Sequence, residues 1–278
     1  MRQAKNDPPF GSALDGILRI AGFFVLIACF LPVHYTYKIF RPRDSFRLPQ
    51  IFHRILLRLL GFRVRMHGAI STAKPTLFVA NHASYLDIPV LGSLVPGAFV
   101  AKSEVANWPL FGFLAKLQRT VFIERRPSQA GEQRDGLRER LAKGEDLLLF
   151  PEGTSTNGLS VLPFKSGLFA VAKDGTGGAA ITVQPVSVVC TALYGLLLTR
   201  DWRPYYAWYG DMTMLKHLWN VFKLGRFTVY VVFHPPLFPQ DFADRKQLAA
   251  ACHTAVARGI ELCLAGRKVG AVPQLSKP

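Results

Sequence analysis

Acidic side chains are scarce in this sequence of 278 residues, since 18 Asp and Glu stand against 34 Lys and Arg. The formal charge of +16 favours an anionic partner, which can be nucleic acid, an anionic membrane leaflet or a phosphate-bearing ligand. Charged residues of both signs make up only 19% of the chain, whereas half of the residues are hydrophobic. This composition is more apolar than that of a typical soluble enzyme.

Long basic runs are also missing, because no five or six Lys and Arg residues follow one another, and no zinc-finger or RNP-type pattern occurs. Aromatic residues between basic ones could suit single-stranded nucleic acid. Between Lys38 and Arg65, however, the basic residues alternate mainly with Leu and Ile. We therefore expect a membrane surface as the partner and no nucleic acid.

Cysteine is rare, and the four thiols show neither a Cys-x2-Cys spacing nor a companion His pattern. A zinc site is therefore not expected, and ordinary buried thiols in a reducing compartment are the simplest interpretation. The sequence also lacks a Gly-x-Ser-x-Gly motif, which excludes the serine nucleophile of the α/β-hydrolases. The cysteines are Cys29, Cys190, Cys252 and Cys263.

An apolar segment near the N-terminus is the first feature that is present. Residues 20–37 carry no charge apart from His34, and a helix of this length spans about 27 Å, the short limit for crossing a bilayer. No cleavage site for a signal peptide follows, and the basic residues after it favour a cytoplasmic location for that flank. The segment can cross the membrane or only dip into it.

Residues 50–63 follow with a helical stripe of Ile, Leu and Phe, and Arg54 and Arg58 lie off this stripe. Such a basic amphipathic helix can lie in the headgroup layer or pack on a protein core. We predict a membrane anchor over residues 1–65, a catalytic domain over residues 66–266 and a disordered tail over residues 267–278.

Short apolar runs then alternate with helical patterns, which predicts an α/β domain with a mostly parallel central sheet flanked by helices. Expected strands are residues 76–80, 98–101, 120–123, 147–150, 181–189, 206–209 and 227–233. Expected helices are residues 84–91, 109–117, 130–142, 167–172, 212–222 and 241–264.

Polar clusters follow three of these strands, at the edge where such a sheet places its site. In the first, Asp87 can fix the tautomer of His82 so that the ring takes a proton from a hydroxyl. Ser84 and Asp87 also form a capping-box pattern, so the carboxylate can instead close a helix N-terminus. The second cluster offers Arg125 to an anion, and the third is a tight turn containing Glu152.

The order and spacing of the three clusters resemble the 1-acyl-glycerol-3-phosphate acyltransferase family, the lysophospholipid acyltransferases with an Asn-His-x4-Asp block. The resemblance covers residues 65–235 and implies a glycerol-3-phosphate acyltransferase-like fold. The matching residues are Asn81, His82 and Asp87 in the first block, Phe122, Ile123 and Arg125 in the second, and Phe150 to Thr154 in the third.

The resemblance implies that His82 is the catalytic base and that Asp87 orients it. It also implies acceptor binding by Arg125, Glu152, Gly153 and Thr154, with Lys102 as a further phosphate contact. The donor would be acyl-CoA or acyl carrier protein, with no metal and no cofactor. The expected product is phosphatidic acid, made from 1-acylglycerol 3-phosphate at the cytoplasmic face of the inner membrane.

One position departs from the family, whose third block continues with Arg where this chain has Ser155. Loss of a charge-assisted contact worth about 1.5–3 kcal/mol would weaken binding of a phosphomonoester. Either Lys165 replaces the cation, or the acceptor is a lipid without a terminal phosphate, such as lyso-ornithine lipid. A non-catalytic lipid-binding protein on the same fold is the alternative from another class.

Overall fold

A computed structural model describes residues 10–40, 46–124, 130–173 and 181–267. Within these residues eight strands form one sheet in the order β1-β8-β6-β2-β5-β3-β4, and β7 pairs with β6. The predicted α/β fold with a mostly parallel sheet is confirmed. The strands are β1 (Arg63–His67), β2 (Thr76–Ala80), β3 (Ala98–Lys102), β4 (Val121–Ile123), β5 (Leu147–Leu149), β6 (Thr182–Leu193), β7 (Leu196–Leu197) and β8 (Phe227–Phe233).

Strand directions bring the candidate clusters to one edge of this sheet. β2 runs parallel to both β5 and β6, and β3 runs parallel to β5 and β4. The carboxyl ends of β2, β5, β3 and β4 therefore lie at the same edge. β7 and β8 are antiparallel to β6, and β1 is parallel to β8, so β1, β7 and β8 run against the other five strands.

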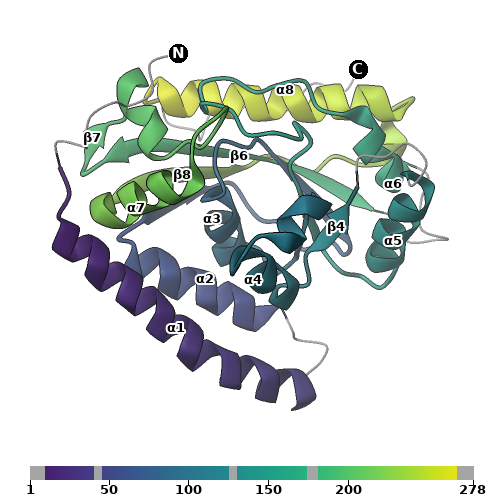
Figure 1. Cartoon of the computed structure of the whole chain (residues 1–278). Helices are drawn as coiled ribbons and strands as arrows, with labels where there is room; N and C mark the ends of the chain where they lie inside the picture. The colour runs from purple at the N-terminus through teal and green to yellow at the C-terminus, as the bar shows by residue number, and fades with distance from the viewer. Residues whose placement is uncertain (1–9, 41–45, 125–129, 174–180, 268–278) are drawn as a thin grey trace.

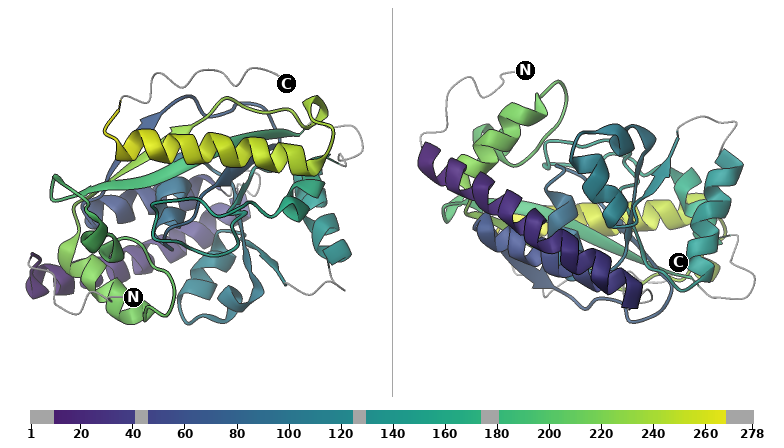
Figure 2. Two further views of the ribbon diagram at one scale, coloured as in Figure 1. Left: turned by 90° about the horizontal axis from the view of Figure 1, so that it is seen from above. Right: turned by 60° about the horizontal axis from the view of Figure 1, so that its bottom comes forward.

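Helices cover both faces of the sheet, with α8 along one face and α1, α2, α3 and α7 on the other (Figures 1 and 2). The α-helices are α1 (Ala13–Phe40), α2 (Arg47–Leu59), α3 (Asp87–Leu94), α4 (Phe111–Leu117), α5 (Ala130–Ala142), α6 (Ala170–Lys173), α7 (Met214–Leu224) and α8 (Arg245–Leu264). Short 3-10 helices are η2 (Ser103–Asn107), η4 (Ser166–Phe169), η5 (Arg200–Tyr205) and η6 (Pro239–Asp241).

Two of the three hydrophobic clusters lie on opposite faces of β2, because side chains alternate along the strand. In β2, Phe78 and Ala80 join the cluster that includes residues of α1, α2, α3 and α7. Leu77 and Val79 join the cluster that includes residues of α5 and α8. Because both faces are covered, β2 is an unbroken apolar run, as expected for a buried parallel strand.

The N-terminal helices pack on this domain. α1 is long and apolar enough to cross a membrane, and only 17% of its most apolar window is buried. Phe23 of α1 and Phe52 of α2 belong to the same core cluster as the sheet. Arg19 donates to the carbonyl oxygens of Phe222 and Lys223, at 2.6 and 3.2 Å, and so binds the C-terminal end of α7.

Of the two interpretations of the amphipathic segment, packing on a protein core is confirmed for α2, and a place in the headgroup layer stays a prediction. His53 lies against α3, because a Cβ at Gly92 would come within 2.5 Å of the imidazole. Ile51 and Ile55 remain exposed on the other side, at 46% and 41%. The helix is therefore packed on the core and also presents an apolar edge to its surroundings.

One predicted strand is wrong. Residues 206–209 pair with no strand; they follow the 3-10 helix η5 as a turn and a loop. Pro204 lies inside η5, and the backbone of this region bonds locally, with the N–H groups of Tyr206 and Ala207 donating to Arg203. β1 and β7 were not predicted. The expected tail over residues 267–278 lies, apart from its first residue, outside the described residues.

Candidate active site

The first of the three sequence blocks is held in place by its asparagine, directly after β2. The side-chain amide of Asn81 accepts from the N–H of Val188 at 2.8 Å and donates to the carbonyl of Val188 at 2.9 Å. This bidentate contact joins the end of β2 to β6 and fixes the backbone that carries the next residue. His82 therefore leaves the sheet edge from a defined position.

His82 and Asp87 form the expected pair, with 3.0 Å between Nδ1 and Oδ2. Because the carboxylate accepts, Nδ1 carries the proton and Nε2 has a free lone pair. Nε2 has no hydrogen-bond partner among the described residues, and the His82 side chain is 19% exposed. The ring can thus take a proton from a bound hydroxyl.

Asp87 is fully buried and accepts hydrogen bonds on both oxygens. Oδ2 accepts the backbone N–H groups of Ala83 and Ser84 at 2.8 and 2.9 Å, in addition to the imidazole. Oδ1 accepts the hydroxyl of Tyr206 at 2.8 Å. The carboxylate therefore closes the turn before α3 and also holds His82. It does not cap the helix, because α3 begins at Asp87 and its N-cap residue, Leu86, has no side-chain cap hydrogen bond.

Glu152 joins the third block to the first. Its two oxygens accept the backbone N–H groups of His82 and Leu162, each at 2.7 Å. Burial raises the pKa of this carboxyl to about 7, although both hydrogen bonds act in the opposite direction. Because both oxygens are occupied by backbone groups, the geometry favours a role in positioning the loop of His82. The acceptor contact that the family resemblance implied is not favoured.

The loop after Glu152 also contacts the first block. The N–H of Thr156 donates to the carbonyl of His82 at 2.9 Å. Gly158 adopts a φ of +71°, and a Cβ there would approach the Cβ of Ala83 to 3.2 Å. Glycine is therefore required twice, for the backbone conformation and for the close approach.

Residues 200–209 are the part of the site that sequence reasoning missed. The N–H of Trp208 donates to the carbonyl of Ala83 at 2.9 Å, and the Ser155 hydroxyl donates to the carbonyl of Trp208. Tyr206, two residues earlier, reaches Asp87. No local sequence pattern identifies these contacts, because Ala83 and Asp87 lie more than 100 residues before Trp208 and Tyr206 in the chain. The only sequence signal is the unusual density of aromatic residues.

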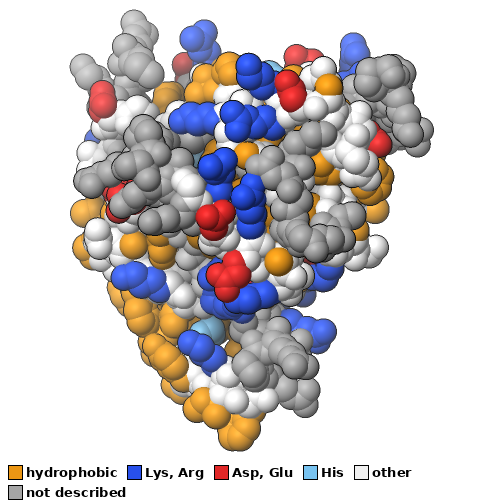
Figure 3. Space-filling view, turned by 90° about the vertical axis from the view of Figure 1, so that its right-hand side faces the viewer, with side chains coloured by type: hydrophobic (Ala, Val, Ile, Leu, Met, Phe, Trp, Pro, Cys, Tyr) orange, Lys and Arg blue, Asp and Glu red, His pale blue; other side chains and the backbone are white. Residues whose placement is uncertain are grey.

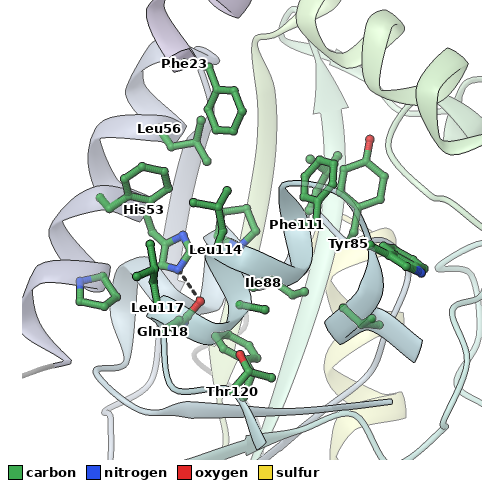
Figure 4. A pocket seen from close by; sticks show the side chains of 18 of the residues that line it. Phe23, His53, Leu56, Tyr85, Ile88, Phe111, Leu114, Leu117, Gln118 and Thr120 are labelled. Atoms are coloured by element: carbon green, nitrogen blue, oxygen red, sulfur yellow. Dashed lines mark hydrogen bonds between the residues drawn. The ribbon is translucent and has the colours of Figure 1, made fainter. Parts of the chain in front are cut away.

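Stacked rings connect the imidazole with an apolar cavity. Phe150 stacks on His82 with 4.1 Å between ring centroids, and the centroid of Phe99 lies 6.1 Å from that of Phe150. Phe99 lines a cavity of about 170 Å³ between α1, α2, α3, α4 and α7 (Figure 4). The side chains of His82, Asp87 and Glu152 do not line this cavity.

The cavity carries no charge at neutral pH. Its lining is apolar except for a few groups, among them a pair in which His53 Nε2 lies 3.0 Å from Gln118 Oε1 (Figure 4). Burial lowers the pKa of His53 to about 4, so the ring is neutral. An uncharged, apolar cavity suits a hydrocarbon chain.

The remaining predicted residues lie at the same sheet edge where they are described. Lys102 is the half-buried last residue of β3 and lies opposite Ile123 of β4. Gly153 has a φ of +70° in the tight turn, and Thr154 is exposed. Arg125, which follows β4 in the sequence, lies outside the described residues. Lys165 is exposed in the loop before η4.

Comparisons with known proteins agree with this geometry. The acyltransferase family model matches residues 62–189. A lyso-ornithine lipid O-acyltransferase of Brucella abortus is 38% identical over 256 residues, which covers 91% of this chain and 96% of the relative. The chain belongs to the 1-acyl-glycerol-3-phosphate acyltransferase family. It is an acyltransferase of the lysophospholipid type, as the three blocks predicted.

Other members of the family give the same picture. A lyso-ornithine lipid O-acyltransferase of Rhodobacter capsulatus is 44% identical and covers 74% of this chain and 73% of the relative. A 1-acyl-sn-glycerol-3-phosphate acyltransferase of Neisseria gonorrhoeae is 34% identical and covers 56% of this chain and 58% of the relative. The solved structure of the acyltransferase PlsC from Thermotoga maritima shares the fold, with a TM-score of 0.66 at 23% identity over 91% of this chain and 97% of that one.

Proposed function

We propose that this acyltransferase moves a fatty acyl group from a thioester to the free hydroxyl of a lyso-ornithine lipid, with His82 as the general base. The observation that carries the choice of acceptor is Ser155. Where the family's third block has Arg, this chain has a hydroxyl that is directed to the Trp208 carbonyl, so the position supplies no cation to a phosphate. The names of the relatives with 38% and 44% identity support the same acceptor.

The sequence analysis placed 1-acylglycerol 3-phosphate first and lyso-ornithine lipid second. The relatives support the reverse order, since the 1-acylglycerol 3-phosphate enzyme of Neisseria gonorrhoeae is 34% identical and covers a smaller part of the chain. 1-Acylglycerol 3-phosphate is therefore the second candidate acceptor. The two differ in charge and shape at the headgroup, so one assay distinguishes them.

The reaction has two proton transfers, one during the attack on the thioester carbonyl and one after the thiolate has left. His82 Nε2 takes the proton of the acceptor hydroxyl while the hydroxyl oxygen attacks the thioester carbonyl. The tetrahedral intermediate then expels the thiol sulfur, the carbon–sulfur bond breaks, and the imidazolium returns its proton to the thiolate. Asp87 stabilises the imidazolium between these steps. Because a thiolate is a good leaving group, we predict that the reaction requires neither a metal nor a cofactor.

The cavity provides a place for a hydrocarbon chain beside the reacting groups. It is separated from His82 by the stacked rings of Phe150 and Phe99, and part of its wall belongs to α1 and α2. Because these two helices also carry exposed apolar side chains, a lipid chain could enter from the membrane without crossing water. We propose that residues 1–65 anchor the enzyme at the cytoplasmic face of the membrane.

Surface charge is consistent with an anionic donor or membrane. In Figure 3, Lys and Arg side chains outnumber acidic ones on the face that carries α5 and α6, while hydrophobic side chains line its lower edge. An acidic acyl carrier protein, the phosphates of acyl-CoA and anionic lipid headgroups would all be attracted to such a face. The donor is therefore proposed only as an acyl thioester.

The test is an acceptor panel with purified enzyme in mixed micelles. Lyso-ornithine lipid and 1-acylglycerol 3-phosphate are each offered with acyl-CoA and with acyl carrier protein thioester, and diacyl product is measured. We expect the higher kcat/KM with lyso-ornithine lipid. A higher value with 1-acylglycerol 3-phosphate would reverse the assignment of the acceptor.

The base is tested by His82→Ala in the same assay. Removing a general base typically costs about 10²–10⁴ in rate, so turnover should fall to that extent while folding and vesicle binding stay unchanged. Near-normal turnover of the purified variant would show that His82 is not the base. A non-catalytic lipid-binding protein would show no turnover in either form.

A further inference from the structure

We propose that Tyr206 is a positioning residue of the catalytic pair, acting through its hydrogen bond to Asp87. The inference rests on the proposed role of His82 and Asp87 and adds a third side chain to it. Tyr206 belongs to none of the three sequence blocks and lies 119 residues after Asp87. Its hydroxyl is 2.8 Å from Oδ1 of the carboxylate.

The four donors around Asp87 are divided unequally between its two oxygens. Oδ2 accepts three N–H groups, which belong to the imidazole of His82 and the backbone of Ala83 and Ser84. Oδ1 accepts the Tyr206 hydroxyl, the one donor recorded for it within the described residues. Removing this hydroxyl would leave a fully buried carboxylate oxygen without a donor, which is strongly unfavourable.

The Tyr206 hydroxyl is a donor throughout the physiological range. The side chain is 2% exposed, and burial together with the neighbouring Asp87 holds the pKa of the phenol well above its ordinary value. The phenol therefore stays protonated, and a carboxylate that only accepts is its partner. The bond fixes the carboxylate plane and stabilises the negative charge on the carboxylate, whose other oxygen contacts His82.

The ring of Tyr206 has a separate role from its hydroxyl. Its centroid lies 5.8 Å from that of Phe227 and 6.4 Å from that of Phe62, so the ring is part of the core beneath the site. Phenylalanine keeps these contacts and deletes only the hydroxyl. Tyr206→Phe therefore separates the effect on Asp87 from the effect on packing.

The pH profile distinguishes positioning from support of the fold. In Tyr206→Phe, one hydrogen-bond donor fewer stabilises the negative charge of Asp87. The carboxylate therefore attracts the proton on His82 Nδ1 more strongly. The imidazole then keeps its second proton to higher pH. The acid limb of kcat/KM should move to higher pH by about half a unit, and the maximal value should fall roughly 10-fold or more.

Other titratable groups face Asp87 and must be distinguished from His82. Glu152 in the loop after β5 and Cys190 of β6 both interact with it electrostatically. Burial raises the pKa of the Cys190 thiol far above neutrality, so it does not titrate in this range. Glu152 does titrate near pH 7, but its two hydrogen bonds go to backbone groups and none goes to Tyr206. Because Asp87 also acts on Glu152, the limb is assigned with Glu152→Gln: a limb that belonged to Glu152 would be absent in that variant, whereas a limb that belongs to His82 would remain.

Tyr194→Phe is the matched control. The Tyr194 hydroxyl donates to the carbonyl of Leu224 at 2.7 Å, away from the catalytic pair, so the control deletes the same group from another tyrosine. Full-length enzymes are compared in mixed micelles between pH 5.5 and 9 with the better acceptor of the panel, and thermal melting is recorded in parallel. We expect the control to keep the wild-type pH profile.

A second variant strengthens the bond rather than removing it. Fluorinated tyrosine at position 206 keeps the ring and the hydroxyl but makes the hydroxyl a stronger donor, so the acid limb should move to lower pH. The proposal is overturned if neither substitution moves the limb, or if Tyr206→Phe lowers the rate equally at every pH. Wild-type turnover and its loss in His82→Ala test the base independently, so either result leaves that assignment unaffected.

Discussion

Glu152 offers a test of how burial controls the site, through the substitution Glu152→Gln. Its side chain is 3% exposed and both oxygens accept backbone N–H groups at 2.7 Å. Glutamine has the same shape but only one oxygen, so one of the two N–H groups faces an amide NH2 and loses its acceptor. An unsatisfied buried donor costs about 1–3 kcal/mol, independent of pH.

The pH dependence of this difference follows from the raised pKa. The carboxyl has a pKa of about 7 in the folded protein and 4.5 as its ordinary value, so the folded state binds the proton more tightly. Between these values the unfolded chain is ionised while the folded protein is still protonated. The stability that wild type holds at low pH is therefore lost as pH rises towards 7.

The size of this loss follows from the shift. At about 1.36 kcal/mol per unit, the stability of wild type relative to Glu152→Gln should fall by about 2–3 kcal/mol between pH 5 and pH 8. For a chain of this size that corresponds to roughly 5 °C in the difference between the two melting temperatures. Melting of both proteins in detergent micelles, followed by tryptophan fluorescence across this range, measures it directly.

The control is Glu139→Gln, the same change at an exposed carboxylate paired with Lys143. That pair lowers the pKa of Glu139, so any pH effect should be small and of opposite sign. If the melting curves of wild type and Glu152→Gln keep a constant separation at every pH, the argument from burial is refuted. Turnover of Glu152→Gln should also fall, because the side chain that joins the backbone N–H groups of His82 and Leu162 then offers one acceptor instead of two.

Two further predictions concern the cavity and the anchor. Ala115→Trp places a large ring in the cavity that Ala115 lines. The value of kcat/KM should therefore fall for long acyl chains and be retained for short ones. Equal losses across a series of chain lengths would show that no chain occupies the cavity. Leu18→Lys with Phe24→Lys removes two apolar side chains that are 59% and 54% exposed on α1, each worth about 1.5–3 kcal/mol when buried in lipid. Vesicle sedimentation should show at least a 10-fold weaker partition, and unchanged partition would place the membrane contact elsewhere.

Much of the fold was readable from the sequence because its signals are local. β2, β8 and α5 occupy the predicted residues, since an apolar run or a helical pattern with clear punctuation defines each of them. β1 was missed because its residues, Arg63–His67, alternate polar and apolar side chains at the sheet edge and are mostly exposed. The predicted anchor boundary at residue 65 therefore falls inside a strand.

The site shows the same division between local and long-range information. The pairing of His82 with Asp87 was predictable, because only one turn of the chain separates the two residues. The contacts of Tyr206 and Trp208 with the first block were not, because folding alone brings these segments together. The aromatic run that indicated a strand is instead a turn whose side chains and backbone bond the catalytic loop. The groups of this turn form hydrogen bonds with the first block and with one another, and not with a neighbouring strand.

The contact between Arg19 and the end of α7 has a consequence for how the enzyme meets its lipids. A flexible tether would let a catalytic domain drift above the bilayer and sample hydroxyl groups at many depths. Here the guanidinium binds the end of α7, so α1 is attached directly to the domain that carries His82. With α1 as the proposed anchor, the depth of His82 relative to the bilayer would follow from the fold, and acceptors that carry their hydroxyl at a different level would react slowly even if their headgroups were suitable.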